Sequence, residues 1–234
     1  MRSIRGRERA HLSRRSVLFL GIGGIVGPAV VRPGRLLAEP LPGPTVAPPP
    51  VRFDVFALGS AIGRHQVDFR PANGGFIADS DIDIDAKVLG VRLFSYTQKT
   101  SETWANGRLQ AFTSTGVDDG KSFSASGRAT GGAFVIEGSK GKITAPADVM
   151  LATYWSSLML SRPQLINPKR GNLKEQTVKP AGQTTVRAGD GERTATRYDI
   201  TGVLDGALFY DQEDHWVGAA FDRKGATVEY RLAA

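Results

Sequence analysis

One predicted strand carries a carboxylate among aromatic side chains. Residues 91–104 read as a long β-strand, and Phe94, Tyr96, Glu102 and Trp104 all fall on its even-numbered face. A glutamate on a buried aromatic face needs a compensating partner. Two interpretations follow. The one we favour is that the strand leaves the core near Glu102. In the other, Glu102 has a partner, such as an arginine or a histidine, and marks a polar spot in a cavity.

His65 is the second candidate. It shares a strand face with Val67 and Phe69, which predicts that it points inward. The ordinary interpretation is a hydrogen-bonded core histidine, and the functional one is a histidine that contacts a ligand. A zinc site needs three or four ligands, and His65 and His215 are the only histidines after residue 38 in a chain without cysteine. No metal site is therefore predicted.

Tyr154 and Trp155 close a third candidate region. They end the segment Pro146–Trp155, which has a proline near its start followed by helix-forming residues and predicts a short helix. The two aromatic residues are core anchors in the simplest interpretation. They become pocket walls if the helix covers a concave sheet.

The other polar clusters are predicted to lie on the protein surface rather than to bind metal or take part in catalysis. Asp79, Asp81, Asp83 and Asp85 alternate along one strand, and a flat strand does not converge the six to eight oxygens that calcium needs. We expect them to pair with lysine or arginine on neighbouring strands. Asp118-Asp119-Gly120 reads as a hairpin turn. No Gly-x-Ser-x-Gly elbow is present, although a Ser-His-Asp set assembled in space stays open, and no catalytic residue is assigned.

These residues require a sheet to position them. From Val51 onward, short alternating segments are separated by turn signals such as Asn106-Gly107, which is typical of a tight hairpin. The pattern predicts a mainly β domain over residues 51–234. We expect one antiparallel, strongly curved sheet or half-barrel of about ten strands, with the short helix against its concave face.

The N-terminal region predicts export. Ser13-Arg14-Arg15-Ser16 opens an apolar run of fifteen residues, shorter than the ~20 that span a membrane. Residues 1–38 therefore read as a twin-arginine signal peptide, with the twin-arginine export machinery as partner and the periplasm as destination. The alternative is an uncleaved signal that anchors the chain to the inner membrane. Residues 39–50 contain six prolines and read as an extended linker.

Charge and composition argue against several classes of partner and cofactor. Residues 1–38 hold eight arginines and one acid, whereas the remainder carries 22 basic and 22 acidic residues. The basic character thus belongs to the signal, and a nucleic-acid partner is not predicted. After cleavage no membrane span is expected. No dinucleotide, haem or iron–sulfur motif is present, so no cofactor is predicted.

Several dispersed motifs carry a resemblance. Ser101-Glu102-x-Trp104-x-x-Gly107-Arg108-Leu109, Asn167-Pro168 and Trp216-Val217-Gly218 are among them. With these motifs the chain from Phe53 onward resembles an exported bacterial family, domain of unknown function 6134. The resemblance implies a periplasmic β-domain and supplies no activity. More loosely, a curved sheet with a plugging helix is similar to folds that carry lipids or lipoproteins, which is an analogy of fold.

Three functions are compatible with these observations. The leading hypothesis is a binding or carrier module for a small hydrophobic or lipid-like ligand, contacted by His65, Phe94, Tyr96, Glu102, Trp104, Tyr154 and Trp155. A continuous pocket lined by these aromatic residues would support it, and a filled core would oppose it. The alternatives are an enzyme with His65 or Glu102 as general base and an envelope assembly or structural factor that uses an exposed strand edge. Whether the protein is an enzyme stays undecided, with binding favoured.

Overall fold

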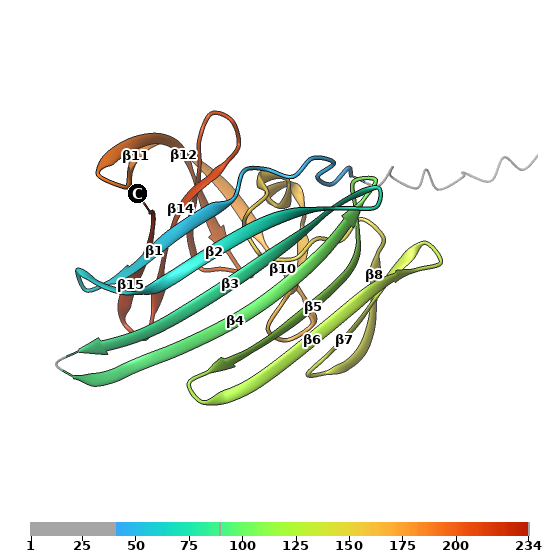
Figure 1. Cartoon of the computed structure of the whole chain (residues 1–234), viewed down its shortest axis with the longest axis horizontal. Helices are drawn as coiled ribbons and strands as arrows, with labels where there is room; N and C mark the ends of the chain where they lie inside the picture. Colours follow the sequence, from blue (N-terminus) through green and yellow to red (C-terminus); the bar gives the residue numbers. More distant parts are fainter. Residues whose placement is uncertain (1–40, 89, 234) are drawn as a thin grey trace, which may run out of the picture. The chain divides into compact units, whose positions relative to one another are not determined.

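The computed structural model describes residues 41–88 and 90–233, and the predicted signal peptide lies outside them. The described chain is built of strands (Figure 1). They are β1 (Val51–Ala57), β2 (Ser60–Ala72), β3 (Gly75–Val88), β4 (Val91–Ala105), β5 (Arg108–Asp118), β6 (Lys121–Thr130), β7 (Ala133–Gly138), β8 (Gly141–Pro146), β9 (Gln164–Asn167), β10 (Asn172–Glu175), β11 (Thr177–Ala188), β12 (Gly191–Thr201), β13 (Gly206–Tyr210), β14 (Trp216–Arg223) and β15 (Ala226–Leu232).

Thirteen of these strands form one sheet, in the order β11-β12-β13-β14-β15-β1-β2-β3-β4-β5-β6-β7-β8. Neighbours are antiparallel, except that β11 also meets β15 in a parallel pairing at Ala188 and Leu232. The remaining two, β9 and β10, form a separate hairpin. The mainly β class is confirmed, but the expectation of about ten strands in a purely antiparallel sheet was wrong. Strands such as β8, β9 and β10 are too short to show a clear alternating pattern.

Tight turns set the register of the long strands. Asn106 and Gly107 join β4 to β5 with φ values of 51° and 66°, and Asp119 and Gly120 join β5 to β6 with 48° and 80°. Two successive positive φ values twist a two-residue turn in the sense that strands prefer. The hairpins predicted at both positions are therefore confirmed.

The outward face of β3 carries the alternating aspartates. Arg70 Nε lies 2.8 Å from Asp79 Oδ2, and Arg92 Nε lies 2.7 Å from Asp85 Oδ1, while Lys99 pairs with Asp81. The predicted cross-strand pairing is confirmed for these three aspartates. Because the pairs are exposed, each contributes little to the free energy of folding.

The helix predicted over Pro146–Trp155 does not form. Residues 149–152 are all buried, so this segment lacks the exposed stripe of a surface helix. It runs beside β9 instead. Ile166 N–H donates to Met150 O (2.8 Å), and Ala152 N–H donates to Ile166 O (3.0 Å). Among the described residues the one helical turn is a 3₁₀ helix, η1 (Ser157–Ser161).

The proline-rich segment is held against the domain where it is described. Arg162, which is 4% exposed, donates from Nη2 to Leu41 O (2.9 Å) and Pro42 O (2.8 Å). Its Nη1 lies 3.3 Å from Asp148 Oδ2, and Gly43 N–H donates to Gly107 O (2.9 Å). These bonds fix where the chain enters the sheet. In residues 41–88 and 90–233, no helix is long and apolar enough to cross a membrane.

Candidate functional site

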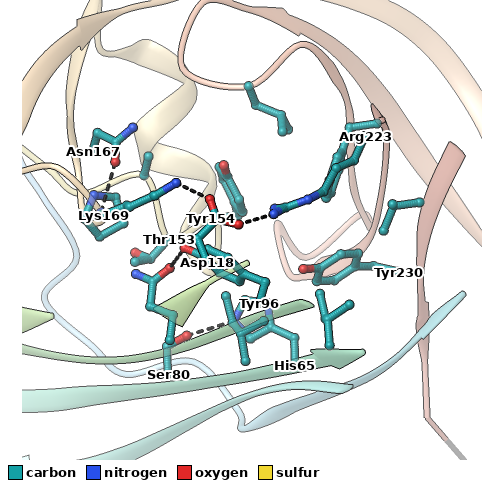
Figure 2. A pocket seen from close by; sticks show the side chains of 18 of the residues that line it. His65, Ser80, Tyr96, Asp118, Thr153, Tyr154, Asn167, Lys169, Arg223 and Tyr230 are labelled. Carbon is teal, nitrogen blue, oxygen red and sulfur yellow. Dashed lines mark hydrogen bonds and ion pairs between the residues drawn. The ribbon is translucent and has the colours of Figure 1, made fainter. Parts of the chain in front are cut away.

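A cavity of about 220 Å³ lies inside the curved sheet, between its middle strands, its C-terminal strands and the connecting segment that follows β8. Its walls are mostly aliphatic and aromatic, with a few polar groups (Figure 2). They are formed by His65, Ser80, Ile82, Ile84, Phe94, Tyr96, Gln98, Asp118, Ala152, Thr153, Tyr154, Asn167, Pro168, Lys169, Val203, Leu204, Phe221, Arg223, Val228 and Tyr230. Apolar walls with few polar groups are typical of small-molecule sites.

A cluster of three charged groups occupies one side of this cavity. Asp118, at the end of β5, pairs with both Lys169 and Arg223. Burial raises the pKa of Asp118, but hydrogen bonds and charges from the two cations outweigh burial and keep that pKa below its usual value. The carboxylate therefore stays ionised and holds two cations that come from distant parts of the chain.

Arg223 also stacks on the aromatic wall. Its guanidinium lies 4.7 Å from the ring centre of Phe94 and 5.2 Å from that of Tyr96. A guanidinium over a ring face gains electrostatic attraction from the π system. Pairing with Asp118 and stacking on β4 together fix the position of Arg223 at the cavity wall.

His65 lies deeper than the charged cluster. It is 2% exposed, and its Nε2 lies 2.8 Å from Ser80 Oγ, whereas its Nδ1 is buried without a partner. Figure 2 shows the pair apart from the cluster formed by Asp118, Lys169 and Arg223. Burial lowers the pKa of His65 to about 3, so the ring is neutral at physiological pH. An unpaired buried nitrogen in a cavity wall is a group that a ligand or a water molecule can satisfy.

Tyrosines supply neutral polar groups to the same cavity. Tyr154 has a φ of 65°, and its carbonyl oxygen accepts a hydrogen bond of 2.6 Å from the Tyr210 hydroxyl. Burial raises the pKa of Tyr154 to about 12 and the pKa of Tyr230 still further. Both phenols therefore stay protonated.

Glu102 lies outside the cavity, in a closed part of the core. It is 1% exposed and accepts three hydrogen bonds. Thr153 Oγ1 donates to Oε1 (2.6 Å), Trp155 Nε1 donates to Oε1 (2.9 Å), and Trp104 Nε1 donates to Oε2 (3.1 Å). The favoured interpretation, that the strand leaves the core here, was wrong. Glu102 has partners, as in the alternative, but they are a threonine and two tryptophans, and Glu102 does not line the cavity. Burial raises the pKa of Glu102, and its three donors offset only part of that rise.

The comparisons with known proteins address fold and family. Residues 53–233 match the family described as Domain of unknown function (DUF6134). The chain belongs to this family. The DUF6134 domain is also similar to a crystal structure described as a beta-barrel-like protein of domain of unknown function DUF1849 from Brucella abortus. The identity is 11% with a TM-score of 0.55, over 80% of this chain and 96% of that one. A comparison with curated proteins gives no match.

Four of the seven residues predicted as ligand contacts line the cavity of the DUF6134 domain: His65, Phe94, Tyr96 and Tyr154. The other three, Glu102, Trp104 and Trp155, instead form the closed hydrogen-bonded group. The predicted inward orientation of His65 is confirmed by its burial. Whether any of the seven contacts a ligand stays a prediction.

Sequence reasoning missed the charged cluster. Asp118 was interpreted as a turn residue, and Arg223 precedes the last hairpin, where charged residues are ordinary. Lys169 lies in a segment without the alternating pattern of a strand. The only sequence signal for the cluster is that Arg223 lies on a strand with aromatic residues. In the part of the chain that the structure describes, no three histidine, cysteine, aspartate or glutamate residues come together in a way that could hold a metal ion.

Proposed function

We propose that this DUF6134 domain binds a small, mainly hydrophobic ligand in the cavity of about 220 Å³. The observation that carries the proposal is the contrast in its lining, which is aliphatic and aromatic over most of the wall and charged on one side. Such a lining favours an apolar body and orients it with a few polar contacts. A fully packed sheet interior would leave no room for that body.

The general-base alternatives are less well supported. His65 and Ser80 have the spacing of a base and a nucleophile, at 2.8 Å. However, a base works best with a pKa near the operating pH, and the pKa of His65 is lowered to about 3. Glu102 accepts hydrogen bonds from three core side chains and lies outside the cavity. Neither group is therefore suited to proton transfer, and only His65 lies where it could contact a ligand.

Native mass spectrometry of the full chain, isolated gently from producing cells, tests the proposal. We expect an additional mass that is retained under native conditions and released on denaturation. Val203→Trp, which fills the cavity wall from a loop, should abolish it, whereas Val91→Trp, at an exposed position outside the cavity, should not. A bare polypeptide mass for the unsubstituted protein would contradict the proposal.

We propose further that the protein is exported by the twin-arginine machinery and acts in the periplasm. The support is the arginine pair Arg14-Arg15 before an apolar run. Replacing both by lysine should move the protein from the periplasmic fraction to the cytoplasm. Recovery in the membrane fraction before substitution would identify the anchored form, and an unchanged distribution after substitution would contradict twin-arginine export.

A further inference from the structure

The charged residues of the cavity wall are Asp118, Lys169 and Arg223, and their charges do not cancel. His65 is neutral, because burial lowers its pKa to about 3, and the tyrosines stay protonated. Two cations thus share a single carboxylate, which leaves the lining with one excess positive charge. An excess positive charge at a partly exposed wall attracts a ligand of opposite sign.

Both cations have hydrogen-bonding capacity left. A guanidinium has five N–H donors and an ammonium has three. Among the described residues, Arg223 donates to Asp118 through Nη2, and Lys169 donates to the other oxygen of the same carboxylate. The remaining donors are positioned, because stacking on Phe94 and Tyr96 holds the guanidinium plane in place. An acid group is the ligand chemistry that uses several such donors at once.

The two sides of the cavity also differ in their exposure to solvent. The side chains of Lys169 and Arg223 are 30% and 26% exposed, whereas His65 at the other side is 2% exposed. Aliphatic residues, among them Ile82 and Val228, line the wall as well. A molecule with one charged end would therefore keep that end near solvent and place its apolar body inside.

We infer that the ligand is a small amphipathic monoanion, whose acid group binds Lys169 and Arg223 and whose hydrocarbon body fills the cavity toward His65. This inference rests on the proposed binding function and names the class of ligand. A charge-assisted hydrogen bond distinguishes such a ligand from its neutral analogue by about tenfold in affinity.

Isothermal titration calorimetry with four probes tests the inference: decanoate, decanol, decylammonium and acetate. We expect decanoate to bind about tenfold more tightly than decanol, with a difference that shrinks at high salt. Decylammonium should bind more weakly than decanol, and acetate, which lacks the apolar body, should not bind measurably. Equal or tighter binding of decanol or decylammonium would overturn the inference and leave the proposed function intact. Absence of binding by all four would contradict both.

Two substitutions make the test specific to the cluster. Arg223→Met should remove about tenfold of the decanoate affinity and lower the decanol affinity much less, because a neutral hydroxyl gains less from the guanidinium than a carboxylate does. Its matched control is Arg70→Met, which breaks an exposed ion pair with Asp79 outside the cavity. Lys169→Met, which leaves Arg223 paired with Asp118 and stacked on Phe94 and Tyr96, should also lower the decanoate affinity. An unchanged decanoate affinity in this variant would overturn the inference even if Arg223→Met fails to fold.

Discussion

Strand β4 passes through two environments on the same inward face. Near its start, Phe94 and Tyr96 border a cavity and meet the guanidinium of Arg223. Near its end, Glu102 and Trp104 are sealed in a core where every side-chain oxygen of the glutamate accepts a hydrogen bond. The same alternating pattern of side chains thus borders a cavity at one end of the strand and a packed core at the other.

The difference comes from the segments that pack on the strand, since the strand pattern itself is unchanged. Thr153 and Trp155 come to Glu102 from the segment after β8 and both donate to its Oε1, while Trp104 of β4 itself donates to Oε2. At the other end, the partners are Lys169 and Arg223, which pair with Asp118 and leave space beside the strand. Which segments pack on the strand therefore decides whether its inward face borders a cavity or a sealed polar group.

The largest expected effect lies at the sealed end. Glu102→Ala leaves three buried donors unpaired, and we expect it to lower the free energy of unfolding by about 3–5 kcal/mol. Urea unfolding measures this loss. Glu137→Ala, at a side chain that is 66% exposed, is the control and should stay within about 0.5 kcal/mol. A loss below about 1 kcal/mol for Glu102→Ala would contradict the sealed network.

At the cavity end, His65 should make stability depend on pH. The unfolded chain takes up this proton below its ordinary pKa of 6.5, while the folded protein does so only near pH 3, because burial lowers the pKa. Stability from this group is therefore full above pH 6.5 and is lost as the pH falls toward 3. Between pH 7 and pH 5 the loss should be about 2 kcal/mol.

Urea unfolding of the wild-type protein and of His65→Phe at pH 7 and pH 5 isolates this contribution. The substitution should remove the loss of about 2 kcal/mol. His215→Gln, which leaves His65 in place, should retain it. Equal pH dependence in the wild-type protein and in His65→Phe would show that the buried ring does not stay neutral in the folded state.

A matched pair of isoleucines tests the difference in packing. Ile136 is fully buried away from the cavity, and Ile84, which is 5% exposed, lines it. Ile136→Phe should overpack the core and cost about 1–3 kcal/mol, whereas Ile84→Phe has space beside it and should cost less than about 1 kcal/mol. Thermal unfolding of the two variants gives the comparison. Similar costs at both positions would mean that the two regions are equally filled.

The smallest effects come from single hydroxyls. Thr153 lines the cavity, but its hydroxyl donates to the sealed carboxylate of Glu102, so Thr153→Val should cost about 1–2 kcal/mol. Ser80→Ala removes the partner of His65, but water can enter a polar cavity and replace it, so we expect less than about 1 kcal/mol. Chemical denaturation resolves the two values. The reverse order would contradict the distinction between a sealed and an accessible region.

Local patterns predicted much of this fold. Asn106-Gly107 marks its hairpin because both residues tolerate positive φ, and the aspartates of β3 face outward because side chains alternate along a strand. Burial of His65 follows from the same alternation. Each of these features depends on neighbours in sequence or on the strand period alone.

The remainder depends on contacts between distant segments. The donors to Glu102 at Thr153 and Trp155 lie about fifty positions along the chain, in a segment that the sequence wrongly predicts as a helix. Arg223 is 105 positions from Asp118, and neither residue stands out locally. A single sequence carries no signal for pairs of this kind, so the charged side of the cavity was beyond prediction, although four residues of its wall were among the predicted ligand contacts.

A crystal structure with bound 10-bromodecanoate tests the central claim most directly, because anomalous scattering locates the bromine. The account predicts the carboxylate at Lys169 and Arg223 and the bromine inside the cavity, toward His65 and Ile82. Bromine outside the cavity, or none bound anywhere, would contradict it.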